Sequence, residues 1–266
     1  YNCQMGPCNF CGFCSDYGCL NYSKASPNAC IMPVLRQRGN FELRTHAQVL
    51  KVNLDDSKTK ATGVTYMDAQ GKEVEQPADL VVLCAFMLYN VHLMLVSGIG
   101  KPYDPVSGTG TVGRNYSYQN LNRVNLFFDK NVQANGFIGI GAGGAVLDDL
   151  NGNQLDNARA GFVGGGVIWA RQPGSGPVRG IATPPGTPGW GSGWKQAIKE
   201  SFRHSFYFEV QGACMSYRDS YLSLDPTYKD AFGRPLLRMT FDWHDNEVRA
   251  SQFLVGKAVE MSKVLN

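Results

Sequence analysis

Six of the eight cysteines lie within the first 30 residues, and their spacing restricts the start of the chain more than any other feature. The central four follow the pattern Cys8-x2-Cys11-x2-Cys14-x4-Cys19. Thiolates so closely spaced on a looping backbone can converge on one metal centre, and bacterial ferredoxins bind iron–sulfur clusters with a near-identical run. Glycines between the thiols permit the tight wrapping that a cluster requires. The pattern therefore predicts an iron–sulfur cluster.

Other uses of the cysteines remain open. Zinc sites usually take two Cys-x2-Cys pairs separated by a longer spacer, which this compact run lacks. Disulfides suit a secreted protein, but thiols two residues apart rarely pair with each other. Cys84 and Cys214 lie in apolar segments, so we predict that they are buried free thiols.

Composition excludes several functional classes. The formal net charge is +3 and no Lys/Arg-rich run occurs, so we expect no nucleic-acid partner. Hydrophobic residues make up 43% of the chain, typical of a folded protein. No run approaches the ~20 apolar residues of a membrane-spanning helix. No initiator Met or signal sequence precedes Tyr1, and the helical pattern before Asn266 stops without a cap, so we expect an internal piece of a longer protein.

Hydrophobic periodicity predicts an α/β first part and an antiparallel second part. In the first part we expect strands at 41–52 and 61–68, a hairpin turn at 68–71, and a helix that ends at Ser97-Gly98. The continuous apolar run 78–85 is typical of a strand buried in a parallel sheet. In the second part we expect strands at 123–129, 161–171, 206–216 and 236–243, a loop at 172–194, and helices at 194–203 and from 244 onward.

Three segments carry a resemblance to a known family. Residues 81–100, VVLCAFMLYNVHLMLVSGIG, resemble the second signature of the glucose–methanol–choline (GMC) flavoprotein oxidoreductases, a strand followed by a helix that closes on SGIG. Residues 111–115, TVGRN, resemble the element that follows in that family. Residues 232–242, FGRPLLRMTFD, resemble a strand late in its substrate domain. With the cysteine run ahead of them, these segments look most like the membrane-associated branch that oxidises gluconate, sorbitol, 2-ketogluconate or glucose.

The resemblance implies a domain layout. We expect a cysteine-rich cluster loop at 1–40, part of a Rossmann-like FAD domain at 41–118, a substrate-binding domain with a large antiparallel sheet at 119–243, and the start of a helix at 244–266. It also implies that Val49 contacts the adenine through its backbone and that Cys84 and Ala85 line the flavin. The pyrophosphate-binding GxGxxG element is expected upstream of Tyr1 and the catalytic His beyond Asn266, so this chain alone should be inactive.

The resemblance further implies an activity and its partners. The expected reaction is FAD-dependent oxidation of a sugar, polyol or sugar acid by hydride transfer to the flavin. Electrons would then pass through a three-iron (3Fe–4S) cluster, for which we expect Cys8, Cys14 and Cys19 as ligands and Cys11 as the spare thiol. The implied partners are a multihaem cytochrome c subunit and a small subunit. The implied location is the periplasm, with attachment to the membrane through a partner subunit.

The chain departs from the family pattern in two places. Phe86 stands where the family has Gly after the strand, and Tyr118-Gln119 replaces a family His. A separate glycine run, Gly139–Gly144, satisfies GxGxxG, but a polar turn precedes it and Asp148-Asp149 follows, so we interpret it as a loop rather than a nucleotide site.

Two other classes of protein stay open. A ferredoxin-like electron carrier would use the cysteines alone. A zinc-stapled carbohydrate-binding module would use tryptophans as sugar-stacking residues: Trp169, Trp190, Trp194 and Trp243.

Overall fold

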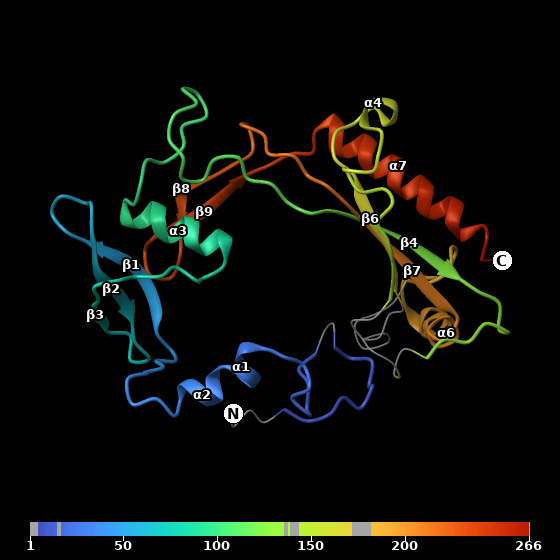
Figure 1. Ribbon diagram of the computed structural model, residues 1–266, viewed down its shortest axis with the longest axis horizontal. Helices are drawn as coiled ribbons and strands as arrows, with labels where there is room; N and C mark the ends of the chain where they lie inside the picture. The colour runs from blue at the N-terminus through green and yellow to red at the C-terminus, as the bar shows by residue number, and fades with distance from the viewer. Residues whose placement is uncertain (1–4, 15–16, 136–137, 139–143, 172–181, 266) are drawn as a thin grey trace. The chain divides into compact units, whose positions relative to one another are not determined.

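The computed structural model describes residues 5–14, 17–135, 138, 144–171 and 182–265, and the chain divides into two compact units (Figure 1). Unit 1 comprises Tyr1–Glu42, Gln119–Cys214 and His244–Asn266. Unit 2 comprises Leu43–Tyr118 and Met215–Trp243. One division between the units falls between residues 118 and 119. Residues 215–243 cluster with the segment that carries the SGIG helix.

Unit 2 is built on a small antiparallel sheet in the order β1-β2-β3. Its strands are β1 (Gln48–Leu54), β2 (Ala61–Met67) and β3 (Glu73–Pro77). Asp68 Oδ1 accepts the backbone N–H groups of Gln70 and Lys72, which closes the predicted hairpin between β2 and β3. Helix α3 (Met87–Ser97) packs against β1, and a second hairpin consists of β8 (Tyr221–Lys229) and β9 (Pro235–Thr240).

Long-range hydrogen bonds join these elements of unit 2. The backbone N–H of Val52 in β1 donates to Ser97 Oγ at the end of α3 (2.9 Å). His92 is buried in α3, and its Nε2 lies 2.7 Å from the carbonyl oxygen of Pro235. Arg234 Nη1 donates to the carbonyl oxygens of Val49 and Leu50 (3.1 and 2.8 Å). The β8–β9 hairpin is thereby attached to both β1 and α3.

Unit 1 is built on an antiparallel sheet in the order β4-β7-β6-β5, with one long helix packed against it. Its strands are β4 (Asn120–Phe127), β5 (Ala145–Leu147), β6 (Gly166–Arg171) and β7 (Ser205–Gly212). Helix α7 (Asp245–Ser262) covers one face of the sheet through a core formed by Ile168, Phe208, Val210, Leu254 and Ala258. The shorter helices are α1 (Pro27–Cys30), α2 (Met32–Leu35), α4 (Asn157–Ala160) and α6 (Gly191–Ser201).

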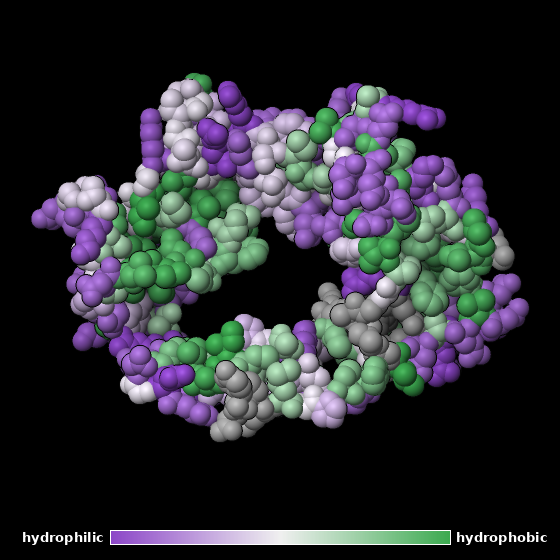
Figure 2. All heavy atoms as spheres, viewed as in Figure 1, coloured by the Kyte–Doolittle hydropathy of each residue, from purple (hydrophilic) through white to green (hydrophobic). Residues whose placement is uncertain are grey.

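The fold class is as predicted, an α/β chain with antiparallel sheets, but the buried parallel strand at 78–85 is wrong. That segment is extended without forming a strand, and Leu80 and Val82 are 79% and 70% exposed. A β-strand requires a hydrogen-bonded neighbour, and across the described ranges no strand pairs with residues 79–85. Cys84 is consequently exposed, so its prediction as a buried thiol is also wrong. Figure 2 shows hydrophobic side chains gathered at the surface over α3.

Other element boundaries differ locally from the predictions. Residues 41–47 are not strand, and the strand begins at Gln48. The short strands β3 and β5 and the longer β8 were not predicted. Residues 139–143 of the glycine run and 172–181 of the predicted loop lie outside the described residues. In the part of the chain that the structure describes, we find no helix with the length and apolarity needed to cross a bilayer.

Phe86, which replaces the family's Gly, has a backbone conformation suited to glycine. Its φ is 68° and its ψ is 157°, a region that side chains with a Cβ adopt only under strain, at a cost of about 1–3 kcal/mol. The Phe86 side chain is largely exposed, so removal of its ring removes little buried apolar surface from the folded state.

We expect Phe86→Gly to raise the free energy of unfolding by about 1 kcal/mol, because relief of strain exceeds the extra chain entropy of glycine. Urea unfolding followed by circular dichroism measures the change. Phe86→Ala is the matched control, since it removes the ring and keeps the Cβ. Equal stability of the Gly and Ala variants would contradict the prediction.

Candidate functional site

The turn that begins α3 contains two of the predicted flavin-lining residues and is held by Asn90. Asn90 Oδ1 accepts the backbone N–H of Ala85 (2.8 Å), and its Nδ2 donates to the carbonyl oxygen of Leu83 (3.1 Å). Cys84 and Ala85 lie between these two bonds and are exposed. One helical side chain thus fixes the backbone path of the predicted contact residues. Asn90 lies inside the family signature, but we did not predict this role from the sequence.

The N-terminus of α3 presents backbone donors to solvent. No side chain caps it, no acidic residue lies in its first turn, and Met87 and Tyr89 are exposed. The first N–H groups of a helix have no intrahelical acceptor, and the helix dipole favours electronegative ligands there. These donors fit the oxygen-bearing groups of FAD. The same end of α3 follows the strained residue Phe86.

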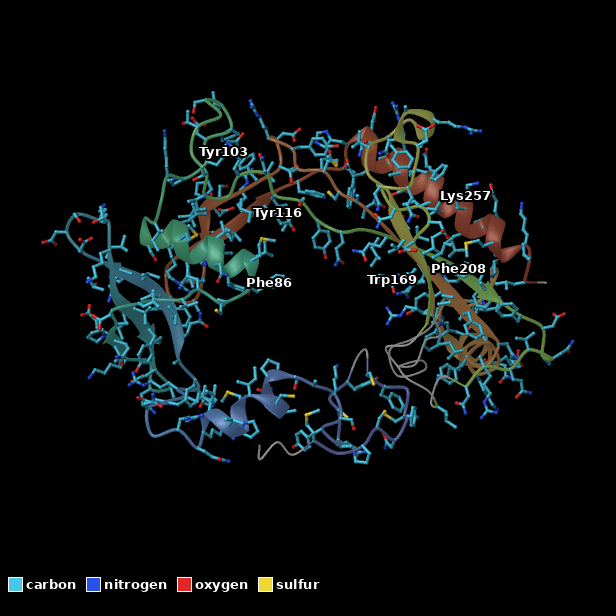
Figure 3. All side chains as sticks on the ribbon, in the orientation of Figure 1. Phe86, Tyr103, Tyr116, Trp169, Phe208 and Lys257 are labelled. Atoms are coloured by element: carbon cyan, nitrogen blue, oxygen red, sulfur yellow. The ribbon has the colours of Figure 1, made fainter. Side chains whose placement is uncertain are left out.

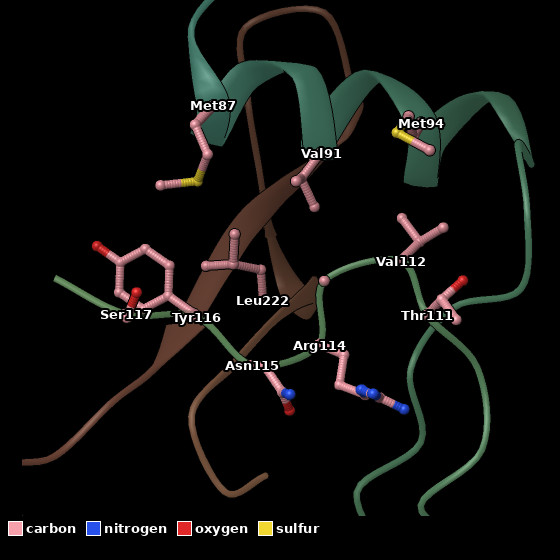
Figure 4. Close-up of a pocket in the computed structure, with 11 residues that line it drawn as sticks. Met87, Val91, Met94, Thr111, Val112, Arg114, Asn115, Tyr116, Ser117 and Leu222 are labelled. Atoms are coloured by element: carbon pink, nitrogen blue, oxygen red, sulfur yellow. The ribbon is translucent and has the colours of Figure 1, made fainter. Parts of the chain in front are cut away.

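A cavity of about 400 Å³ lies beside α3 in unit 2 (Figure 4). Met87, Val91 and Met94 project from α3 toward the segment 111–117, and Leu222 of β8 completes the wall. Asn115 also lines the cavity, and its Oδ1 is buried with no hydrogen-bond partner among the described residues. The lining combines an apolar side with this polar group, as small-molecule sites do.

The position of the TVGRN segment is fixed by backbone bonds to the β8 region. Leu222 N–H donates to the carbonyl oxygen of Gly113 (2.7 Å), and Tyr116 N–H donates to that of Ser220 (2.8 Å). Gly113 has φ 89°, and a Cβ built there would lie 2.1 Å from the carbonyl oxygen of Leu222. Glycine at this position is therefore a steric requirement of the close backbone pairing.

Val49, the predicted adenine contact, lies in β1 at the edge of its sheet. Its carbonyl oxygen accepts a hydrogen bond from Arg234. Val49 belongs to the strand against which α3 packs, whereas Cys84 and Ala85 belong to the turn before α3. No hydrogen bond joins Val49 to that turn within the described chain. Arg234 was not predicted to have a role, although the segment 232–242 was singled out.

The cysteine loop is folded back on itself by the turn 19–24. Ser23 Oγ donates to the carbonyl oxygen of Pro7 (2.8 Å), and Lys24 Nζ donates to that of Cys14 (2.6 Å). Gly6 N–H donates to the carbonyl oxygen of Asn21 (2.9 Å). Residues 6–14 and 19–24 are therefore held together by several polar contacts.

Backbone donors lie close to two of the four central thiols. Phe10 N–H lies 3.3 Å from Cys8 Sγ. The backbone N–H of Lys24 lowers the pKa of the Cys19 thiol; partial desolvation opposes this shift, and donors from Asn21 and Ser23 add to it. N–H groups aimed at sulfur favour the thiolate, which is the form that binds metals.

The four predicted metal ligands, Cys8, Cys11, Cys14 and Cys19, are thiols without disulfides. In the described ranges, no three His, Cys, Asp or Glu side chains are already grouped to hold a metal ion. Cys3 lies outside the described residues. The donor set nevertheless fits an iron–sulfur cluster chemically, because it offers soft thiols with N–H donors at sulfur.

Comparison with known proteins matches the first part of the chain to a family and the whole chain to longer relatives. Residues 2–120 match the family described as GMC oxidoreductase. The chain is 55% identical over 266 residues to the gluconate 2-dehydrogenase flavoprotein of Pantoea cypripedii, covering 100% of this chain and 43% of that protein. It is 28% identical over 232 residues to a 2-methyl-1,2-propanediol dehydrogenase of Mycolicibacterium austroafricanum, covering 84% of this chain and 40% of the relative.

A solved structure shares the fold. It is a formate oxidase of Aspergillus oryzae RIB40 studied for FAD modification, with a TM-score of 0.51 and 15% identity, covering 81% of this chain and 42% of that chain. The chain thus spans less than half the length of each of these proteins. The match at residues 2–120 and the identity along the whole chain agree with the signature segments, and residues 2–120 belong to a GMC oxidoreductase domain.

Proposed function

We propose that the protein containing this chain is an FAD-dependent dehydrogenase that oxidises a sugar, polyol or sugar acid, with a gluconate-like acid as the preferred substrate. The observation that carries this proposal is the 55% identity to a gluconate 2-dehydrogenase flavoprotein, which extends over all 266 residues. The identity therefore spans both units, including the cysteine loop of unit 1.

The proposed flavin contacts lie in unit 2. FAD, when bound, supplies a hydride acceptor for oxidation of the substrate alcohol. Asn90 holds Cys84 and Ala85 in the turn that would line the flavin. The uncapped N–H groups of α3 would donate to cofactor oxygens, and Val49 would contact the adenine through its backbone. We propose that the catalytic His belongs to a part of the protein outside these residues.

The proposed metal ligands are Cys8, Cys14 and Cys19, with Cys11 as the spare thiol. Support comes from the donors near Cys8 and Cys19 and from Lys24, which contacts both the Cys14 carbonyl oxygen and the Cys19 thiol. A 3Fe–4S cluster held there would supply one-electron transfer to a haem partner. Because metal binding commonly organises its own ligand loop, the three ligand thiols need not converge beforehand.

We also propose the partners and location that this activity requires. A multihaem cytochrome c subunit would receive the electrons, and a small subunit would complete the assembly. The protein would act in the periplasm and be attached to the membrane through a partner subunit.

The cluster proposal predicts a specific pattern of iron loss. In the complete FAD-containing protein we expect about three irons per polypeptide. Cys8→Ser, Cys14→Ser and Cys19→Ser should each lose most of the iron, because each removes a thiolate ligand, whereas Cys11→Ser should retain it. Iron analysis and electron paramagnetic resonance measure the outcome, and FAD content serves as the internal control. Loss of iron from Cys11→Ser to the same extent, or zinc in place of iron in the unaltered protein, would refute the assignment.

The substrate proposal predicts anaerobic bleaching of the flavin. Gluconate added to the complete protein should abolish the absorption band at about 450 nm, because hydride transfer reduces the flavin. Stopped-flow spectra with gluconate, glucose and sorbitol rank the substrates by reduction rate. A flavin that none of these compounds reduces would rule out the proposed activity.

A further inference from the structure

The sheet of unit 1 has two chemically different faces. Phe208 and Val210 of β7 point into the core beneath α7. Side chains alternate along a strand, so Tyr207, Glu209 and Gln211 point to the opposite face. Figure 3 shows Trp169 and Phe208 on opposite sides of the sheet. We call the side opposite α7 the open face.

Strand register defines the residues of the open face. Directly opposed residues of antiparallel strands share a face, and the pairs are Arg123 with Glu209, Asn125 with Tyr207, and Leu121 with Gln211. On the other side of β7, Trp169 opposes Glu209, Arg171 opposes Tyr207, and Val167 opposes Gln211. The open face is therefore formed by β4, β7 and β6, with Glu209 at its centre.

The charges on the open face do not cancel. Glu209 is only 7% exposed, and Arg171 Nη1 lies 2.6 Å from its Oε2, which pairs the buried carboxylate. Arg123 Nη2 lies 3.9 Å from Glu209 Oε1, beyond hydrogen-bonding distance. Among the nine face residues given by the register, two guanidinium groups face one carboxylate, which leaves one positive charge in excess.

The guanidinium of Arg123 is the more exposed of the two positive charges. Its guanidinium lies over the ring of Tyr207, 4.1 Å from the centroid, and its side chain is 53% exposed. The ring of Tyr207 and the nearby carboxylate of Glu209 together restrict the position of the guanidinium. A planar guanidinium held in this way matches the two oxygens of a carboxylate.

The surrounding side chains suit a polyhydroxylated acid. Trp169 and Tyr207 offer aromatic surface, and the amides of Asn125 and Gln211 can both donate to and accept from hydroxyl groups. A small carboxylate without hydroxyl groups would contact the arginine and leave the amides without partners. A neutral sugar would contact the amides and leave the excess positive charge without a counter-charge. The combination of the two chemistries favours a sugar acid.

We infer that Arg123 on the open face binds the carboxylate of a sugar acid and thereby sets the preference for acids over neutral polyols. This inference rests on the proposed function and names a specificity-determining residue for it. Glu209 and Tyr207 are positioning residues, since they hold Arg123 and need not touch the substrate.

The test is substitution of Arg123 in the complete FAD-containing protein. Arg123→Gln should raise the KM for gluconate at least tenfold, since a charge-assisted bidentate contact is lost, and should change the KM for sorbitol less than twofold. Arg123→Lys should be intermediate, because it keeps the charge and loses the planar fork. Arg249→Gln is the control, since that exposed arginine lies on α7, over the other face. Arg123 is preferred to Arg171, whose removal would leave Glu209 buried without its closest partner.

Two results would overturn the inference: an equal loss for gluconate and sorbitol, or no change for either. Calorimetric binding of gluconate to the oxidised protein provides a readout that does not depend on turnover. If the unaltered protein binds gluconate and Arg123→Gln does not, the carboxylate site is supported. This result holds even if no sugar reduces the flavin, an outcome that would refute the proposed activity alone. Equal binding to both proteins, or no binding to the unaltered protein, refutes the site.

Discussion

Unit 2 depends on the guanidinium of Arg234. It bonds to two consecutive carbonyl oxygens in β1 and forms an ion pair with Asp230 (2.8 Å), so a residue late in the chain holds an edge strand near its start. The buried His92 adds a second attachment, from α3 to the residue after Arg234. Because α3 also bonds to β1 through Ser97, hydrogen bonds connect β1, α3 and the β8–β9 hairpin to one another.

In unit 1 the corresponding constraint is the alternation of side chains along β7. Phe208 and Val210 supply the apolar core beneath α7, while Glu209 between them carries a buried charge to the open face. A buried carboxylate is tolerated only when it is paired, and Arg171 provides the pair. The second arginine on that face, Arg123, is what makes the sheet a candidate for anion recognition as well as a structural support.

The cysteine loop is held in shape by its own hydrogen bonds. The turn 19–24 holds the loop together through Ser23 and Lys24, and N–H groups already favour the thiolate of Cys19. In the proposed cluster site, convergence of the three ligand thiols would be a separate step, because like-charged thiolates repel until a metal neutralises them.

Several features could be predicted from the sequence alone, because they depend on local interactions. The cysteine spacing, the Asp68 hairpin and the end of α3 at Gly98, with φ 70°, depend on residues close together in the chain. Only tertiary structure decided that the apolar run 79–85 has no strand partner in the described chain, that Arg234 binds β1, and that Arg123 faces Glu209. Each of these depends on segments far apart in sequence, and hydrophobic periodicity reports which residues prefer burial without specifying the partner.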